Sequence, residues 1–72
     1  MKGETKEFRF KRIAEKRVQR VLDSIRSLSQ CSNKRMYKWE DGQLVKIWNA
    51  IDDELKKCRQ SFEEAEPEDF KL

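Results

Sequence analysis

The sequence predicts an all-α fold, a two-helix antiparallel hairpin that forms one domain over residues 1–72. Three observations support this prediction. Apolar residues recur at helical spacing in two long segments. The chain has two glycines and one proline, which is too few for a turn-rich β protein. Charged residues make up 43% of the chain, and no run approaches the roughly 18 apolar residues that a membrane-spanning helix needs.

The first helix is predicted over about residues 5–30. Its apolar residues recur mainly in steps of three and four, with no glycine or proline between them, which is typical of an amphipathic helix. Thr5 is well placed to cap the first turn. The apolar positions are Phe10, Ile13, Ala14, Val18, Val21, Leu22, Ile25 and Leu28. This face is wider than one partner helix can cover.

The connection is predicted over residues 31–39. Asn33 is expected to end the first helix in a left-handed conformation, because asparagine tolerates positive φ better than most residues. Trp39 comes just before the second helix, where it can pack on Leu44 as a hydrophobic staple.

The second helix is predicted over about residues 40–63. Glu40 is expected to cap it, and Gln43 follows at the capping-box spacing. Pro67 prevents a helix further on, so residues 64–72 are expected to form an acidic tail. The apolar stripe has steps of four and three in turn, the rhythm of a bundle helix, and consists of Leu44, Trp48, Ile51, Leu55, Cys58 and Phe62.

A hairpin of this size buries little apolar surface, so it needs a further source of stability. Aromatic residues of the loop and tail could fold over the first helix, or two hairpins could pair into a four-helix bundle. We expect the second arrangement, a homodimer. The residues expected to share its core are Val18, Val21, Ile25, Trp48, Ile51 and Leu55.

Enzymatic activity is not expected. The chain has no histidine, so it lacks the commonest general base and the commonest metal ligand. Cys31 and Cys58 supply only two of the four ligands of a structural zinc site, and we expect them to be small buried hydrophobic residues. We therefore predict no catalytic residues, no metal and no cofactor. No apolar segment follows the first residues, which favours a cytoplasmic protein without a signal peptide.

Charge is unevenly distributed. Residues 1–36 carry a net charge of +7 and residues 37–72 a net charge of −4. One face of the first helix bears four cations at helical spacing, Arg9, Arg12, Lys16 and Arg20. This face could bind a polyanion such as nucleic acid, or the acids of residues 63–69 could neutralise it within the protein.

The connection also mixes cations and aromatic rings. Its candidate binding residues are Lys34, Arg35, Tyr37, Lys38 and Trp39. Aromatic rings beside cations can grip single-stranded nucleic acid, and the same residue types dominate hot spots of protein interfaces. A third interpretation is that the aromatic side chains close one end of the core.

Part of the sequence resembles small helical proteins of bacterial phages and mobile elements. The resemblance covers about residues 10–62 and rests on Val21-Leu22, Ile25-Arg26, Leu28, Cys31-Ser32-Asn33, Tyr37, Gln43, Lys46-Ile47, Ala50-Ile51 and Glu54-Leu55. It implies an accessory protein or an inhibitor, for example of host defence, that binds a larger protein or nucleic acid. It implies no active residues.

We therefore expect a non-enzymatic binding protein that acts by protein–protein contact. The alternative is a nucleic-acid-binding regulator that uses the basic face and the loop, since the architecture is similar to the ROP-type dimeric hairpin, which binds RNA. A third class is an assembly subunit whose only activity is self-association.

Overall fold

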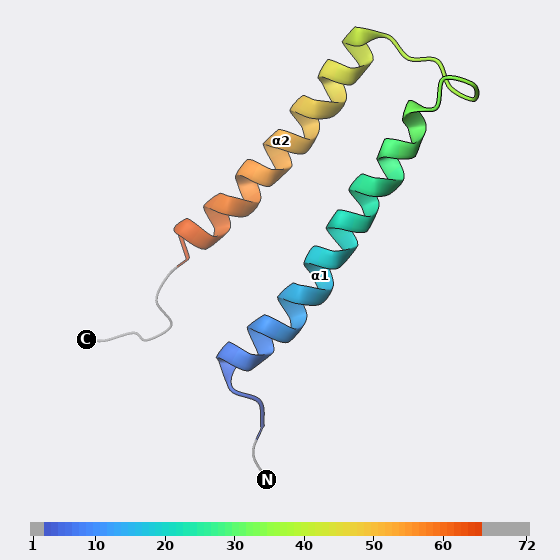
Figure 1. Ribbon diagram of the computed structural model, residues 1–72. Helices are drawn as coiled ribbons and strands as arrows, with labels where there is room; N and C mark the ends of the chain where they lie inside the picture. The colour runs from blue at the N-terminus through green and yellow to red at the C-terminus, as the bar shows by residue number, and fades with distance from the viewer. Residues whose placement is uncertain (1–2, 66–72) are drawn as a thin grey trace. The chain divides into compact units, whose positions relative to one another are not determined.

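The computed structural model describes residues 3–65 and contains two helices joined by a loop (Figure 1). Helix α1 spans Lys6–Ser29, a short 3₁₀ helix η1 spans Gln30–Ser32, and helix α2 spans Asp41–Glu63. The chain divides into two units, Met1–Lys38 and Trp39–Leu72, which are described separately below. Residues 3–65 contain no β-strand, so the predicted all-α class is confirmed.

Helix α1 begins where the sequence predicts. The hydroxyl of Thr5 accepts a hydrogen bond from the backbone N–H of Phe8 at 3.1 Å, as an N-cap residue does. The carbonyl of Thr5 accepts a second bond from the backbone N–H of Arg9 at 3.0 Å. Glu7 lies in the first turn, where a negative charge is favourable to the helix dipole.

The end of α1 differs from the prediction. Asn33 has φ −72° and ψ 106°, and no residue in the range 3–65 has a positive φ, so the left-handed cap is wrong. The chain instead leaves α1 through η1, and the Asn33 N–H donates to the Gln30 carbonyl at 3.4 Å. The Asn33 side chain then accepts a bond from the Arg35 N–H at 3.0 Å, which is the local bonding pattern of an Asx turn.

Helix α2 begins with the predicted cap. Glu40 is the N-cap residue, and its backbone N–H donates to Gln43 Oε1 at 2.8 Å, the bond that the capping box requires. Trp39 and Leu44 are both half-buried, as the predicted staple needs, although the staple contact itself stays a prediction. Residues 66–72 of the predicted acidic tail lie outside the described residues.

The apolar faces of both helices are exposed. None of residues 3–65 is buried. The six residues expected to share a core are each between 37% and 56% exposed in the single chain. Cys31 and Cys58 are free and exposed, so the prediction that they are buried is wrong for the single chain. Capping hydrogen bonds within a few residues thus account for where the helices begin. Burial of the apolar faces requires contact with another surface.

Candidate binding surfaces

Four predicted site residues lie on one face of α1. Arg9, Arg12, Lys16 and Arg20 are all exposed and follow one another in steps of three, four and four. At about 100° per residue these steps keep the four side chains within a sector of about 80°, which we call the basic stripe. Such a row of like charges is mildly unfavourable within a helix unless an anion compensates it.

Glu4 compensates one end of the basic stripe. Arg12 Nε lies 2.7 Å from Glu4 Oε2, and Arg12 Nη2 lies 3.0 Å from Glu4 Oε1, so the guanidinium holds the carboxylate with two parallel bonds. Arg9 Nε lies 3.7 Å from the same Oε1. The sequence had indicated residues 63–69 as the internal acids, of which 66–69 lie outside the described residues. Glu4 was not anticipated.

These contacts lower the pKa of the Glu4 carboxyl below its ordinary value of 4.5. The main cause is the hydrogen bonding from Arg12; partial desolvation opposes it, and the attraction of the positive charges of Arg12 and Arg9 adds to it. The same hydrogen bonding raises the pKa of Arg12. The pairing is therefore complete above pH 4.5 and is lost as the pH falls through the lowered pKa.

A titration of Glu4 tests this contact. In carbonyl-detected NMR the Glu4 carboxyl is expected to titrate with a midpoint below 4.5, and Arg12→Ala is expected to move that midpoint upward. Arg20→Ala is the control, because it removes a charge from the same stripe without touching Glu4. Equal midpoints in the wild type and in Arg12→Ala would contradict the contact.

The other end of the basic stripe has no such partner. The side chains of Lys16 and Arg20 form no hydrogen bond or ion pair with any residue in the range 3–65. Further along α1, Arg26 Nη1 pairs with Asp23 Oδ1 at 3.3 Å. The basic stripe therefore consists of a neutralised part near the N-terminus and a free part in the middle of the helix.

The predicted loop residues are also exposed, with one exception. Lys34, Arg35, Tyr37 and Lys38 are all exposed. The turn that presents them is ordered by Asn33, whose carbonyl accepts bonds from the backbone N–H groups of Met36 at 3.1 Å and Tyr37 at 3.0 Å. A shallow depression at this turn is lined by Gln30, Ser32, Asn33, Met36 and Tyr37.

Trp39 differs from the other predicted loop residues. It is half-buried and belongs to the second unit, which suits its position before the cap of α2 better than a role as a fully exposed contact residue. Met36, which the sequence analysis did not select for binding, is 70% exposed. A flexible apolar side chain at that level of exposure suits a protein-contact surface.

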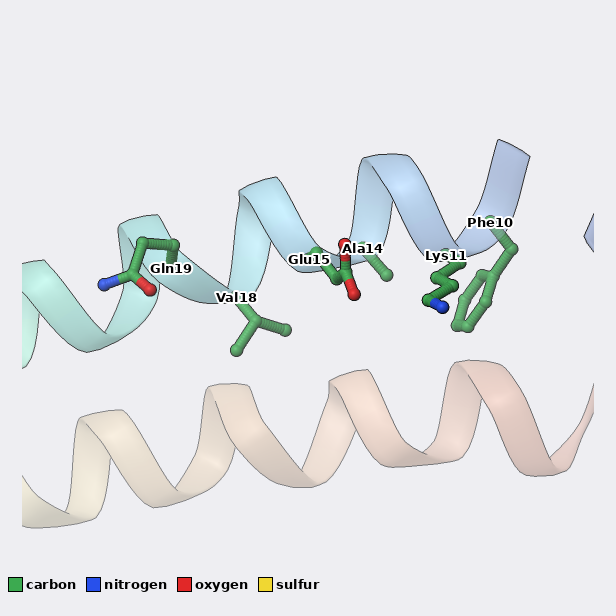
Figure 2. Close-up of a pocket in the computed structure, with 6 residues that line it drawn as sticks. All are labelled: Phe10, Lys11, Ala14, Glu15, Val18 and Gln19. Carbon is green, nitrogen blue, oxygen red and sulfur yellow. The ribbon is translucent and has the colours of Figure 1, made fainter. Parts of the chain in front are cut away.

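A second shallow depression lies on α1 (Figure 2). Its apolar row consists of Phe10, Ala14 and Val18, each four residues from the next, and these side chains extend from the same side of the helix in Figure 2. A parallel polar row, Lys11, Glu15 and Gln19, borders it. An open apolar strip with a polar edge has the pattern of a surface that packs against another helix.

Neither a metal centre nor a membrane span is found in the part of the chain that the structure describes. No three His, Cys, Asp or Glu residues among those described are grouped as metal ligands would be. No described helix is both long and apolar enough to cross a bilayer. Comparisons with protein-family models, with curated proteins and with solved structures give no match for this chain.

Proposed function

We propose that the chain is a non-enzymatic binding protein that acts by protein–protein contact. One observation carries the proposal. Large apolar side chains are exposed along one face of each helix, among them Val21 at 56% and Trp48 at 50%. Water-exposed apolar surface of this extent marks interaction sites in proteins, and burying it provides the main favourable free energy of association.

The first partner is a second copy of the chain. We propose that the two helices fold into an antiparallel hairpin and that two hairpins pair into a four-helix bundle, whose core is the set of six residues predicted above. The alternation of four- and three-residue steps in α2 supports this arrangement, because it is the pattern that keeps a helix packed along a bundle core. The basic stripe lies roughly opposite the apolar face of α1 and remains outside.

The second partner is a larger protein with an acidic or nucleic-acid-like surface. Lys16 and Arg20 have no acidic partner among the described residues, and the loop presents Arg35 and Tyr37 to solvent. In keeping with its resemblance to phage and mobile-element proteins, the chain acts in the cytoplasm by binding this larger protein. It serves as an accessory protein or as an inhibitor of a host defence or regulatory protein.

Direct nucleic-acid binding is the alternative function. The specific observation in its favour is the continuous basic stripe, in which Lys16 and Arg20 have no anionic partner within residues 3–65 that would compete with phosphate groups. The ROP-type hairpin, which binds RNA, supports this alternative by its similar architecture only. No residue of this chain is matched to one of its residues.

A tagged pull-down from bacterial lysate, with and without nuclease, separates these functions. Capture of one protein regardless of nuclease supports the leading proposal, provided that Lys16→Ala with Arg20→Ala abolishes it. The matched control is Lys56→Ala with Arg59→Ala, which makes the same change of charge on α2. Recovery that depends on nucleic acid supports the alternative. A dimer that captures nothing contradicts the second partner and the alternative function, and leaves an assembly subunit whose only activity is self-association.

A further inference from the structure

We propose that Arg9 and Arg12 form a phosphate-binding site for the nucleic-acid backbone and that Glu4 occupies this site as an internal competitor. The inference rests on the alternative function above, nucleic-acid binding, and adds a regulated site to it. It assigns a specific role to Glu4, for which the sequence analysis gave none.

The geometry of the Glu4 contact is that of an anion in a binding site. Two nitrogens of the Arg12 guanidinium face the two carboxylate oxygens at 2.7 Å and 3.0 Å, and Arg9 approaches one of those oxygens from the preceding turn at 3.7 Å. Arginine binds carboxylate and phosphate with the same two-pronged geometry. The Glu4 carboxylate therefore stands where a phosphate would bind.

Glu4 is positioned so that it can leave without disturbing the helix. It precedes the N-cap residue and lies outside α1. The cap is made by Thr5, whose hydroxyl and carbonyl bind the first-turn N–H groups independently of Glu4. Displacement of Glu4 costs the chain one ion-pair cluster at the surface and leaves the N-terminal hydrogen bonds of the helix in place.

Competition by Glu4 makes binding selective for long polyanions. The eleven residue-to-residue steps from Arg9 to Arg20 span about 16 Å of helix. A ligand with one phosphate gains a single site by displacing Glu4, whereas a backbone with phosphates in a row also reaches Lys16 and Arg20. Only the second kind of ligand therefore binds while Glu4 keeps its contacts with Arg9 and Arg12.

The salt dependence of binding reports the number of phosphates that are neutralised. On duplex DNA the logarithm of the affinity falls with the logarithm of the salt concentration by about 0.9 per phosphate contact. With Glu4 in place, the two free cations of the basic stripe give a slope of about −1.8. Release of Arg9 and Arg12 from Glu4 raises the number of phosphate contacts to four. The slope then steepens to about −3.6.

Fluorescence anisotropy with a labelled DNA duplex of 12 base pairs, between 50 and 200 mM salt, tests the proposal in the full chain. Glu4→Gln is expected to bind about tenfold more tightly than the wild type at 50 mM salt and with the steeper slope. Glu7→Gln is the matched control. It removes the same charge from the same end of α1, and Glu7 pairs with no described residue, so its slope is expected to stay at the wild-type value.

The outcomes distinguish the competitor role of Glu4 from nucleic-acid binding by the chain as a whole. Equal affinities and slopes in Glu4→Gln and Glu7→Gln, with measurable binding by all proteins, overturn the competitor role and leave nucleic-acid binding intact. Absence of binding by every protein overturns both. Adding Arg12→Ala to Glu4→Gln is expected to reduce the slope again, and unchanged helix content by circular dichroism excludes unfolding as the cause.

Discussion

Replacement of Ile51 by alanine is expected to lower the free energy of unfolding by about 2–5 kcal/mol. Ile51 lies in the middle of the apolar stripe of α2 and is 37% exposed in the single chain. A loss of this size requires a site that is closed on all sides, because only there does the removed side chain leave a cavity. In the proposed dimer, a second hairpin supplies the missing contacts.

Urea unfolding followed by circular dichroism at a fixed protein concentration measures this effect. Gln60→Ala is the control, since Gln60 lies on the opposite side of α2 at helical spacing and is exposed. The control is expected to change the unfolding free energy by less than about 0.5 kcal/mol. Equal effects of the two substitutions would contradict burial of Ile51.

Replacement of Trp48 by alanine is expected to weaken dimerisation by a hundredfold or more. Truncation of a buried tryptophan costs about 3–5 kcal/mol, and each 1.4 kcal/mol corresponds to a factor of about ten in the equilibrium constant. Trp48 is 50% exposed in the single chain, so most of this loss arises only if association buries the indole ring.

Tryptophan fluorescence gives a direct view of that burial. In a Trp39→Phe background the emission comes from Trp48 alone, because the chain has two tryptophans. Dilution through the dissociation range is expected to shift the emission to longer wavelength as the ring enters water. An emission maximum that is independent of protein concentration while the dimer dissociates would show that Trp48 lies outside the interface.

The helices could be predicted from the sequence because local signals specify where each of them begins. Thr5 caps α1, and Glu40 with Gln43 opens α2, each through bonds within three residues. Asn33 was predicted incorrectly for a related reason. Its preference for positive φ is weak, and the 3₁₀ turn that follows α1 offers the backbone another exit, in which the Asn33 side chain binds the Arg35 N–H instead.

The candidate site was predicted only in part. The basic stripe follows from helical spacing, and all four of its residues lie on α1 as expected. The role of Glu4 was missed because it reaches Arg12 across eight residues from outside the helix, beyond the three- and four-residue spacings that sequence rules use. Cys58 was predicted to be buried and is exposed. Its place on the apolar stripe indicates which face of the helix it lies on, but not whether another surface covers that face.

Sedimentation equilibrium of the full chain tests the central claim, self-association through the apolar faces, most directly. The account predicts a mass of about twice the 8.7 kDa of one chain at micromolar concentration, together with a melting temperature that rises with protein concentration. A monomer at hundreds of micromolar, with undiminished helix content by circular dichroism, would contradict the account.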